Sequence, residues 1–166
     1  MSNVTNWELR IKPMNNFTCK LVQNNDIEEL VKVSIRSFHS DYLVGAPSKN
    51  GGPPGYDSIQ FHNKILEKAE AFYKINENEK IIGGFWIFCK GNNHIELSRV
   101  FIDPDYQRQG IGLRVFDYLF SKYPNVQKWS LDTPKWNKRT FNFYTELGFL
   151  VEREDNFFYY FAKTIT

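Results

Sequence analysis

Cysteine, methionine and histidine are scarce in this chain, whose 166 residues include two cysteines, two methionines and three histidines. Cys19 and Cys89 form no C-x-x-C pair and lie in strand-like stretches. We therefore expect buried free thiols, as in a cytoplasmic protein, and neither a disulfide nor a nucleophile. The histidines, His39, His62 and His94, lack the spacing of metal ligands, so the sequence predicts no metal site.

Long apolar runs and an excess of one charge are also missing. The longest apolar run, around Ile81 to Cys89, is too short to cross a bilayer. Residues Met1 to Thr5 lack the pattern of a secretion signal, and we expect a cytoplasmic protein. The 21 basic and 19 acidic residues give a formal net charge of +2. This balance indicates no general attraction to nucleic acid or membranes.

Aromatic residues, by contrast, make up 17% of the chain. This fraction indicates a well-packed interior and some ring-lined surface, which could include the interface of a homodimer. The length fits a single domain over residues 1–166 with a sizeable core.

Apolar periodicity and turn residues predict alternating strands and helices without internal repeats. We expect an α/β fold with a mixed, mostly antiparallel central sheet and helices on both faces. The expected strands are a short extra strand over 7–12, then 17–22, 71–76, 80–89, 94–102, 127–131 and a final pair around 151 and 157–163. The expected helices run from Asn25 or Asp26 to about His39, from Asp57 or Ser58 to near Ala69, from Ile111 to Lys122 and from Asn137 to just before Gly148.

The most informative motif is the run from Gln107 to Gly112, QRQGIG, between an apolar strand and a helix. Glycines at such a junction let backbone amides approach one point, because no Cβ blocks them. The first helical turn carries unpaired N–H groups and a partial positive charge, so the junction can bind an anion. The spacing is neither that of a Rossmann fingerprint nor that of a P-loop. On its own, the run is equally compatible with a turn that caps a surface helix.

A second motif runs from Asn137 to Phe149, after the strand expected over 127–131. Asn137 can cap a helix, and Gly148 suits the position just past its end. The residues that share one face of this helix, at spacings of three and four, are Thr140, Phe143, Tyr144 and Leu147.

Together, the Q-x-x-G-x-G run and the Y-x-x-x-G-F end of the second motif resemble two hallmarks of the GNAT superfamily of N-acetyltransferases, in the order that the family uses. The resemblance is specific from Ile95 to Phe149 and looser, by element order only, from Phe17 to Lys90 and after Phe149. It implies the acyl-CoA N-acyltransferase fold and transfer of an acetyl group from acetyl-CoA to a primary amine, by direct attack in a ternary complex. The implied acceptor is a small molecule or a peptide with a free amine.

The resemblance also implies which residues hold acetyl-CoA. The main chain of the strand before the glycine run would follow the pantetheine arm, and the backbone amides from Arg108 to Gly112 would meet the pyrophosphate. Asn137 would hydrogen-bond the arm or the phosphates, with or without capping the helix. Arg108 and Arg114 would add charge, or else they are solvated surface residues. The implied acetyl-CoA-binding residues are Val100, Phe101, Ile102, Gln107, Arg108, Gln109, Gly110, Ile111, Gly112, Asn137 and Tyr144.

Transfer from a thioester to an amine needs a base for the amine, a donor to the oxyanion and an acid for the thiolate. Glu96, eleven positions before Gln107, matches the general-base position of many family members and would act directly or through a water. In the alternative interpretation, Glu96 is only a solvated carboxylate at a strand edge. Tyr144 holds its proton at neutral pH and, by resemblance, lies near the sulfur as the acid. In the alternative interpretation, Tyr144 is an aromatic core residue that only packs the helix against the sheet.

By the same resemblance, the loop from Asp41 to Tyr56 corresponds to the acceptor side of the family's site, and it is either a structured lid or a loose connector. Together with Glu96, Asp132 would favour a cationic amine. Candidate acceptor-binding residues are Tyr42, Tyr56, Trp86 and Asp132, with Phe61 and Trp136 as further walls, and each is otherwise ordinary core or surface.

Two other classes of function fit the same residues. The fold could keep acyl-CoA as a sensor without turnover, although a decayed site need keep neither Glu96 nor Tyr144. The glycine run could also be only a turn in an interaction protein, whose aromatic residues form a dimer interface and which binds no cofactor.

Overall fold

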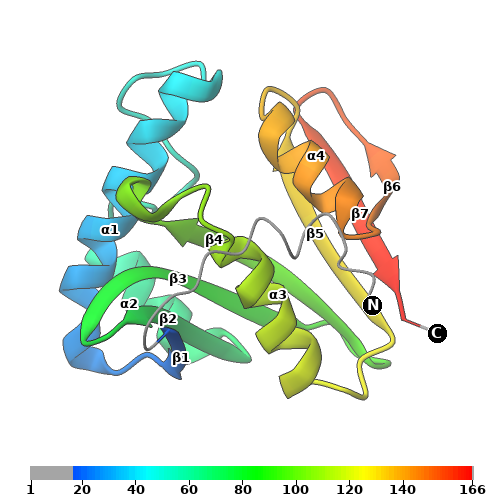
Figure 1. Ribbon diagram of the computed structural model, residues 1–166, viewed down its shortest axis with the longest axis horizontal. Helices are drawn as coiled ribbons and strands as arrows, with labels where there is room; N and C mark the ends of the chain where they lie inside the picture. The colour runs from blue at the N-terminus through cyan, green and yellow to red at the C-terminus, as the bar shows by residue number, and fades with distance from the viewer. Residues whose placement is uncertain (1–16, 166) are drawn as a thin grey trace, which may run out of the picture.

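The computed structural model describes residues 17–165 (Figure 1). Within them the chain forms one seven-stranded sheet with the strand order β1-β2-β3-β4-β5-β7-β6. The strand expected over 7–12 lies outside the described residues. The strands are Phe17–Leu21 (β1), Ala71–Glu77 (β2), Lys80–Cys89 (β3), His94–Ile102 (β4), Lys128–Pro134 (β5), Leu150–Glu154 (β6) and Phe158–Thr164 (β7). The helices are Ile27–Ser40 (α1), Ile59–Lys68 (α2), Ile111–Lys122 (α3) and Lys138–Glu146 (α4), with short 3-10 turns at Asn24–Asp26 (η2), Asp41–Val44 (η3) and Pro104–Tyr106 (η4).

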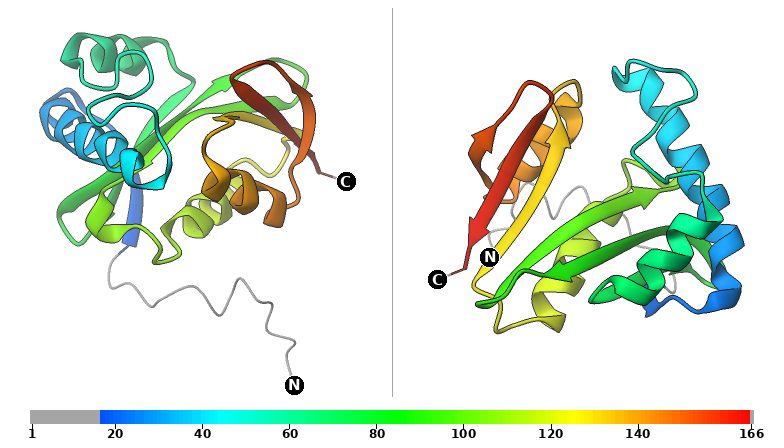
Figure 2. Two further views of the ribbon diagram at one scale, coloured as in Figure 1. Left: turned by 90° about the horizontal axis from the view of Figure 1, so that it is seen from above. Right: turned by 180° about the vertical axis from the view of Figure 1, so that it is seen from behind.

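The sheet is mixed and mostly antiparallel. Among the strand pairs of residues 17–165, only β4 and β5 run parallel. Helices α1 and α2 pack on one face, and α3 and α4 on the other (Figure 2). This arrangement confirms the predicted α/β fold. Element order alone did not indicate that β7 enters the sheet between β5 and β6.

Strands β4 and β5 part soon after their pairing begins. The parallel pairing covers only His94 to Glu96 on β4 and Lys128 to Ser130 on β5, although the strands continue to Ile102 and Pro134. Beyond the paired segment the two strands diverge like the arms of a V (Figure 2). Their inner edges therefore carry main-chain groups that need partners from outside the sheet.

A β-bulge in β4 decides which side chains face which core. The register between β3 and β4 shifts between Trp86 and Ile87, which leaves Ser98 as the extra residue. Leu97, before the bulge, joins the core under α3 and α4, whereas Phe101, after it, joins the core under α1 and α2. Because side chains alternate along a strand, these two residues would otherwise share one face.

Local capping signals place α2 and α4 where the sequence predicts them. Ser58 Oγ accepts the Phe61 amide at 3.0 Å at the start of α2, and Asn137 Oδ1 accepts the Thr140 amide at 3.1 Å at the start of α4. Gly148 ends α4 in the left-handed conformation, with φ +92°.

Both cysteines are free, as predicted, but they differ in burial. Cys19 is half-buried, and desolvation raises the pKa of its thiol to about 12. Cys89 ends β3 and is exposed, so the prediction that it is buried was wrong. Its strand is apolar almost to the end, but the last residue emerges from under the helices. No helix within residues 17–165 is long and apolar enough to cross a membrane.

Candidate active site

A cleft of about 1270 Å³ opens where β4 and β5 part. On one side it is bounded by the glycine run and the starts of α3 and α4, and on the other by the end of α1 and the loop that follows. Side chains from both faces of the sheet line it, for example Phe116 of α3 and Phe38 of α1. The cleft therefore passes through the sheet at the V.

The glycine run forms the turn between η4 and α3. Gly110 has φ +82° and Arg108 has φ +62°, and a non-glycine residue in this region carries strain of the kind found in binding loops. Gly110 is the N-cap residue of α3, and no described side chain caps the helix. The first-turn amides of Ile111 and Gly112 therefore lack intrahelical partners at the cleft wall, where they can bind an anion.

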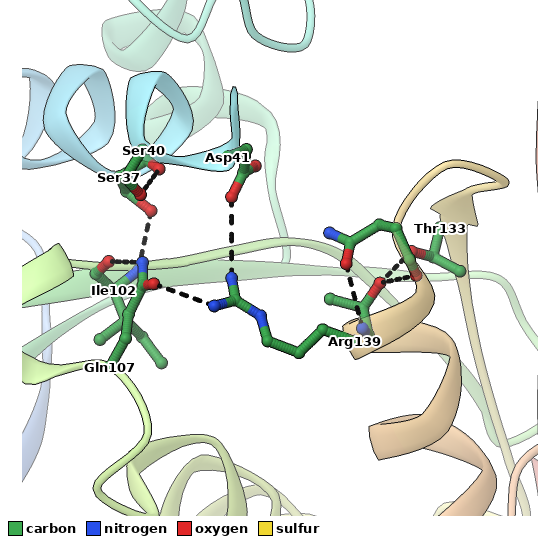
Figure 3. Close-up of polar contacts among 9 residues, drawn as sticks. Ser37, Ser40, Asp41, Ile102, Gln107, Thr133 and Arg139 are labelled. Atoms are coloured by element: carbon green, nitrogen blue, oxygen red, sulfur yellow. Dashed lines mark hydrogen bonds and ion pairs between the residues drawn. The ribbon is translucent and has the colours of Figure 1, made fainter. Parts of the chain in front are cut away.

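Two glutamines fix the shape of this run. Gln107 Nε2 donates to the Ile102 carbonyl at 2.9 Å, and its Oε1 accepts from Arg139 Nη1 at 3.4 Å (Figure 3). Gln109 Nε2 donates to the Asp105 carbonyl at 3.1 Å and does not belong to the cleft wall. Gln107 thus joins β4 to α4, whereas the side chain of Gln109 supports the loop from outside.

The inner edge of β4 offers main-chain groups to the cleft around Val100. The Ile102 N–H donates to Ser37 Oγ at 3.3 Å and its C=O accepts from Gln107, so both groups point away from β3 (Figure 3). Val100 lies two residues before Ile102, with no register shift between them, so its N–H and C=O also point away from β3. Phe101 instead packs its ring under α1 and α2. An extended ligand chain would therefore pair with the strand at Val100.

Gly112 and Asn137 bring α3 and α4 together at the cleft. A Cβ at Gly112 would lie 3.0 Å from the Phe143 ring, so the glycine allows the two helices to approach. Asn137 is 6% exposed and uses its Oδ1 for the helix cap, as its capping interpretation predicts. Its Nδ2 donates to none of the described residues and lies in the cleft wall, where it can donate to a ligand.

Tyr144 projects from α4 into the cleft wall and is 6% exposed. Its ring packs among those of Phe116, Phe149 and Phe161, with centroids 5.9–6.1 Å away. Within residues 17–165 its hydroxyl makes no hydrogen bond. Burial raises the pKa of this phenol, and the negative charge of Asp132 raises it further. Tyr144 is therefore a core residue that presents a protonated hydroxyl to the cleft.

The two predicted carboxylates share one face of the sheet but differ in access to the cleft. Glu96 lies in the last pair between β4 and β5, with its Oε2 3.7 Å from Lys90 Nζ, and does not belong to the cleft wall. Asp132 lies beyond the paired segment and lines the cleft. Asp132 is exposed at the cleft surface, and partial desolvation there raises its pKa, Glu96 raises it further, and Arg99 opposes the shift. Asp132 is the carboxylate that a ligand would meet.

The predicted acceptor walls divide into two groups. Asp132 and Trp136 line the cleft. Trp86 is 1% exposed in the core under α1 and α2, so its prediction as a pocket wall was wrong. The predicted residues that lie outside the cleft wall are Tyr42, Tyr56, Phe61 and Trp86.

Tyr56 has a different role, in the loop that follows α1. Its hydroxyl lies 2.8 Å from His39 Nε2 and donates to the Asn50 carbonyl at 3.1 Å. These bonds fold residues 50–56 against α1, and the carbonyl of Pro54 accepts a hydrogen bond from Arg99 Nη2 at 3.0 Å. The loop is therefore an ordered wall of the cleft and no loose connector, whereas its action as a lid stays a prediction.

Sequence reasoning missed four charged residues of the cleft, Asp41, Arg99, Arg139 and Glu146. Arg139 Nη2 on α4 lies 3.8 Å from Asp41 Oδ1 at the end of α1 (Figure 3). Burial raises the pKa of Asp41 to about 6, although the charge of Arg139 opposes the shift. The available signal for Asp41 was its place at the start of the loop already marked as the acceptor side. Within residues 17–165, no three His, Cys, Asp or Glu side chains are grouped to hold a metal ion.

Comparisons with known proteins agree with this architecture. YrkN, an uncharacterized protein of Bacillus subtilis, is 34% identical over 130 residues, which cover 75% of this chain and 68% of YrkN. The PaiA N-acetyltransferase of Thermoplasma acidophilum, solved in complex with coenzyme A, matches with a TM-score of 0.74 at 19% identity, over 90% of this chain and 99% of that one. The ribosomal-protein-S18-alanine N-acetyltransferase of Escherichia coli matches with a TM-score of 0.67 at 17% identity, over 90% and 94%. A model of the acetyltransferase (GNAT) family matches residues 35–149, and the chain therefore belongs to the GNAT acetyltransferase family.

Proposed function

We propose that residues 1–166 form one domain that transfers the acetyl group of acetyl-CoA to a primary amine, by direct attack while both substrates are bound. The observation that carries this proposal is the cleft through the sheet, with a helix start that can bind an anion on one side and Asp132 on the other. The presence of coenzyme A in the similar PaiA structure supports acetyl-CoA as the donor.

The donor fits the side of the cleft that α3 and α4 form. The amides from Arg108 to Gly112 would bind the pyrophosphate, with the helix dipole of α3 adding to the attraction. The N–H and C=O of Val100 would pair with the pantetheine arm, and Asn137 Nδ2 would donate to it. Arg139 lies beside Gln107 and can turn from Asp41 toward a phosphate, since the Arg139–Asp41 contact is long and half-exposed.

The chemistry follows from which groups lie on each side of the V. The amine loses one proton, its nitrogen bonds to the thioester carbon, and the C–S bond breaks. Tyr144 donates its proton to the departing thiolate, and a raised pKa keeps that proton on the phenol at neutral pH. Glu96 remains the predicted general base, acting through a water, because its side chain lies outside the cleft wall.

Two further expectations belong to this proposal. Both cysteines are free, which supports a reducing compartment such as the cytoplasm. The homodimer expected from the aromatic content stays a prediction.

The proposal is tested by following free thiol released from acetyl-CoA in the presence of a panel of primary amines. Release that depends on both the protein and an amine is the expected result. Saturable binding of acetyl-CoA without release for any amine would instead indicate an acyl-CoA sensor, and no binding by folded protein would indicate that the glycine run is only a turn.

A further inference from the structure

The acceptor side of the cleft contains a half-buried cation, the guanidinium of Arg99, whose Nη1 atom is buried. The β4 bulge turns this side chain to the face of α1 and α2, just beyond the point where β4 leaves β5. There the Arg99 Cζ atom lies 4.9, 5.3 and 5.9 Å from the ring centroids of Trp86, Phe61 and Phe38. The rings hold the guanidinium in place while it lines the cleft.

The charge of Arg99 is poorly compensated by its surroundings. Its Nη2 donates to the Pro54 carbonyl, and its buried Nη1 has no hydrogen-bond acceptor among the described residues. Arg99 also forms no ion pair within residues 17–165. Desolvation lowers its pKa to about 10, and only the charge of Asp132 opposes this shift. Buried cations in proteins are normally paired, because an unpaired charge loses its hydration without compensation.

Asp132 faces Arg99 from the other arm of the V. It stands on β5 beyond the paired segment and lines the same cleft. Each of the two groups influences the ionisation of the other, yet they form no direct ion pair at 4 Å or less. A cation and an anion therefore flank the space that an acceptor must cross on its way to the thioester.

The rim of this space is apolar. Phe157 is 72% exposed at the turn before β7, and two prolines of the loop that follows α1 line the same cleft. An acceptor with an apolar body would cover these exposed surfaces, which gives a favourable contribution to binding. The apolar residues of the rim are Phe38, Pro53, Pro54, Trp136, Phe157 and Phe158.

We propose that the acceptor is a free α-amino acid with an apolar side chain, whose carboxylate binds Arg99 and whose ammonium binds Asp132. This inference rests on the proposed acetyl transfer and narrows its acceptor. The α-ammonium group gives up one proton to become the free amine, whose nitrogen forms the new N–C bond and then gives up a second proton. The C–S bond breaks and the thiolate takes up one proton, so one proton is released to solvent overall. The products are an N-acetyl amino acid and free CoA.

A polyamine fits the same space less well. Its second ammonium group would approach the guanidinium of Arg99, and like charges at close range repel each other. A planar guanidinium also matches a carboxylate through two parallel hydrogen bonds, which makes such a pair more specific than a point charge. The arrangement thus selects for one positive and one negative group on a single small molecule.

The test compares matched acceptors at saturating acetyl-CoA, with thiol release as the readout. L-phenylalanine and L-leucine are each compared with the corresponding amide and with the decarboxylated amine, and spermidine is included. We expect kcat/KM to be about 10-fold or more higher for the amino acids than for their matched amines, which is the discrimination expected from one charge-assisted hydrogen-bonded pair.

Variants then assign that preference to Arg99. Arg99→Gln should bring the ratio of kcat/KM for the amino acid to kcat/KM for the matched amine close to one. Arg99→Lys should keep part of the preference, since the charge remains but the planar guanidinium is lost. Arg153→Gln is the matched control. The Arg153 Cζ atom lies 3.7 Å from the ring centroid of Tyr160, and Arg153 does not belong to the cleft wall. Thermal unfolding and acetyl-CoA affinity show whether each variant is folded. If Arg99→Gln does not fold, the ratio of kcat/KM for amino acids to that for their matched amines, measured on the native protein, decides whether the acceptor is an amino acid.

Three results would overturn the proposal. Equal or better turnover of the amines, the amides or spermidine would reject an amino-acid acceptor and leave the acetyltransferase function intact. The same conclusion holds if acetyl-CoA binds but neither amino acid is acetylated. Failure of folded protein to bind acetyl-CoA would instead reject the proposed function itself.

Discussion

Arg139 and Asp41 join the two sides of the cleft, with 3.8 Å between Nη2 and Oδ1 (Figure 3). Arg139 belongs to α4, on the donor side, whereas Asp41 follows α1, on the acceptor side. The Asp41 side chain is only 16% exposed, so its carboxylate is poorly hydrated. The ion pair with Arg139 does not fully compensate for this loss of hydration. This pair makes the stability of the protein depend on pH.

We predict that Asp41→Asn flattens this pH dependence. The pKa of Asp41 is raised to about 6 in the folded protein from an ordinary value of 3.8, so the folded state binds more protons than the unfolded state between these values. Stability therefore falls as pH rises from about 4 to about 6. Thermal unfolding should show Asp41→Asn to be more stable than the native protein at pH 7.5 and similar to it at pH 4. The exposed Asp57→Asn serves as the control, and an equal difference at both pH values would contradict the prediction.

Gly110 and Gly91 form a matched pair for testing the glycine run. Their φ angles are +82° and +81°, so alanine at either position costs about 1 kcal/mol of backbone strain. Gly91 lies in the turn between β3 and β4 and does not belong to the cleft wall. We expect both substitutions to lower the melting temperature by similar amounts, but only Gly110→Ala to weaken binding of acetyl-CoA measured by calorimetry. Equal affinities of the two variants would remove the run from the donor site.

Tyr144→Phe isolates the hydroxyl from the ring. The ring packs among other aromatic rings, and phenylalanine keeps those contacts, so the melting temperature should change little. Loss of the proton donor should lower kcat by about 10²-fold or more at every pH of the assay, because the raised pKa keeps the native phenol protonated throughout. Tyr159→Phe, outside the cleft wall, should keep the native rate. A native rate for Tyr144→Phe would reduce Tyr144 to a packing residue.

Glu96→Gln and Asp132→Asn distinguish a base from a binding group. Glu96→Gln should lower turnover near neutral pH. The loss of turnover should be smaller at high pH, where the free amine is abundant. Asp132→Asn should act mainly by raising KM for the amine, since Asp132 lines the cleft. Steady-state kinetics across pH would separate the two effects, with Glu154→Gln at the Lys135 surface pair as the control. An identical pH profile for Glu96→Gln and the native protein would place the base elsewhere.

Most of the fold could be predicted from the sequence because its signals are local. Asn137, Ser58 and Gly148 mark helix boundaries through hydrogen bonds and backbone conformations within a few residues, and each acts as expected. The order of β5, β7 and β6 could not be predicted in this way, because strand pairing between distant segments leaves no local signature.

The donor side of the cleft was more predictable than the acceptor side for a physical reason. Gln107 to Gly112 and Asn137 act through their own turn and helix, whereas acceptor walls depend on which face each strand residue occupies. Residues 81–89 are apolar on both faces, so no alternation showed that Trp86 is core. Arg99 faces α1 and α2 only because the bulge at Ser98 shifts the register.

The central claim is that the cleft between β4 and β5 binds acetyl-CoA. Isothermal titration of the folded protein with acetyl-CoA tests it most directly. We predict saturable binding at one site, weakened in Gly110→Ala and retained in Gly91→Ala. No detectable binding by protein with a cooperative thermal unfolding transition would contradict the account, and the run from Gln107 to Gly112 would then be an ordinary turn at the start of a helix.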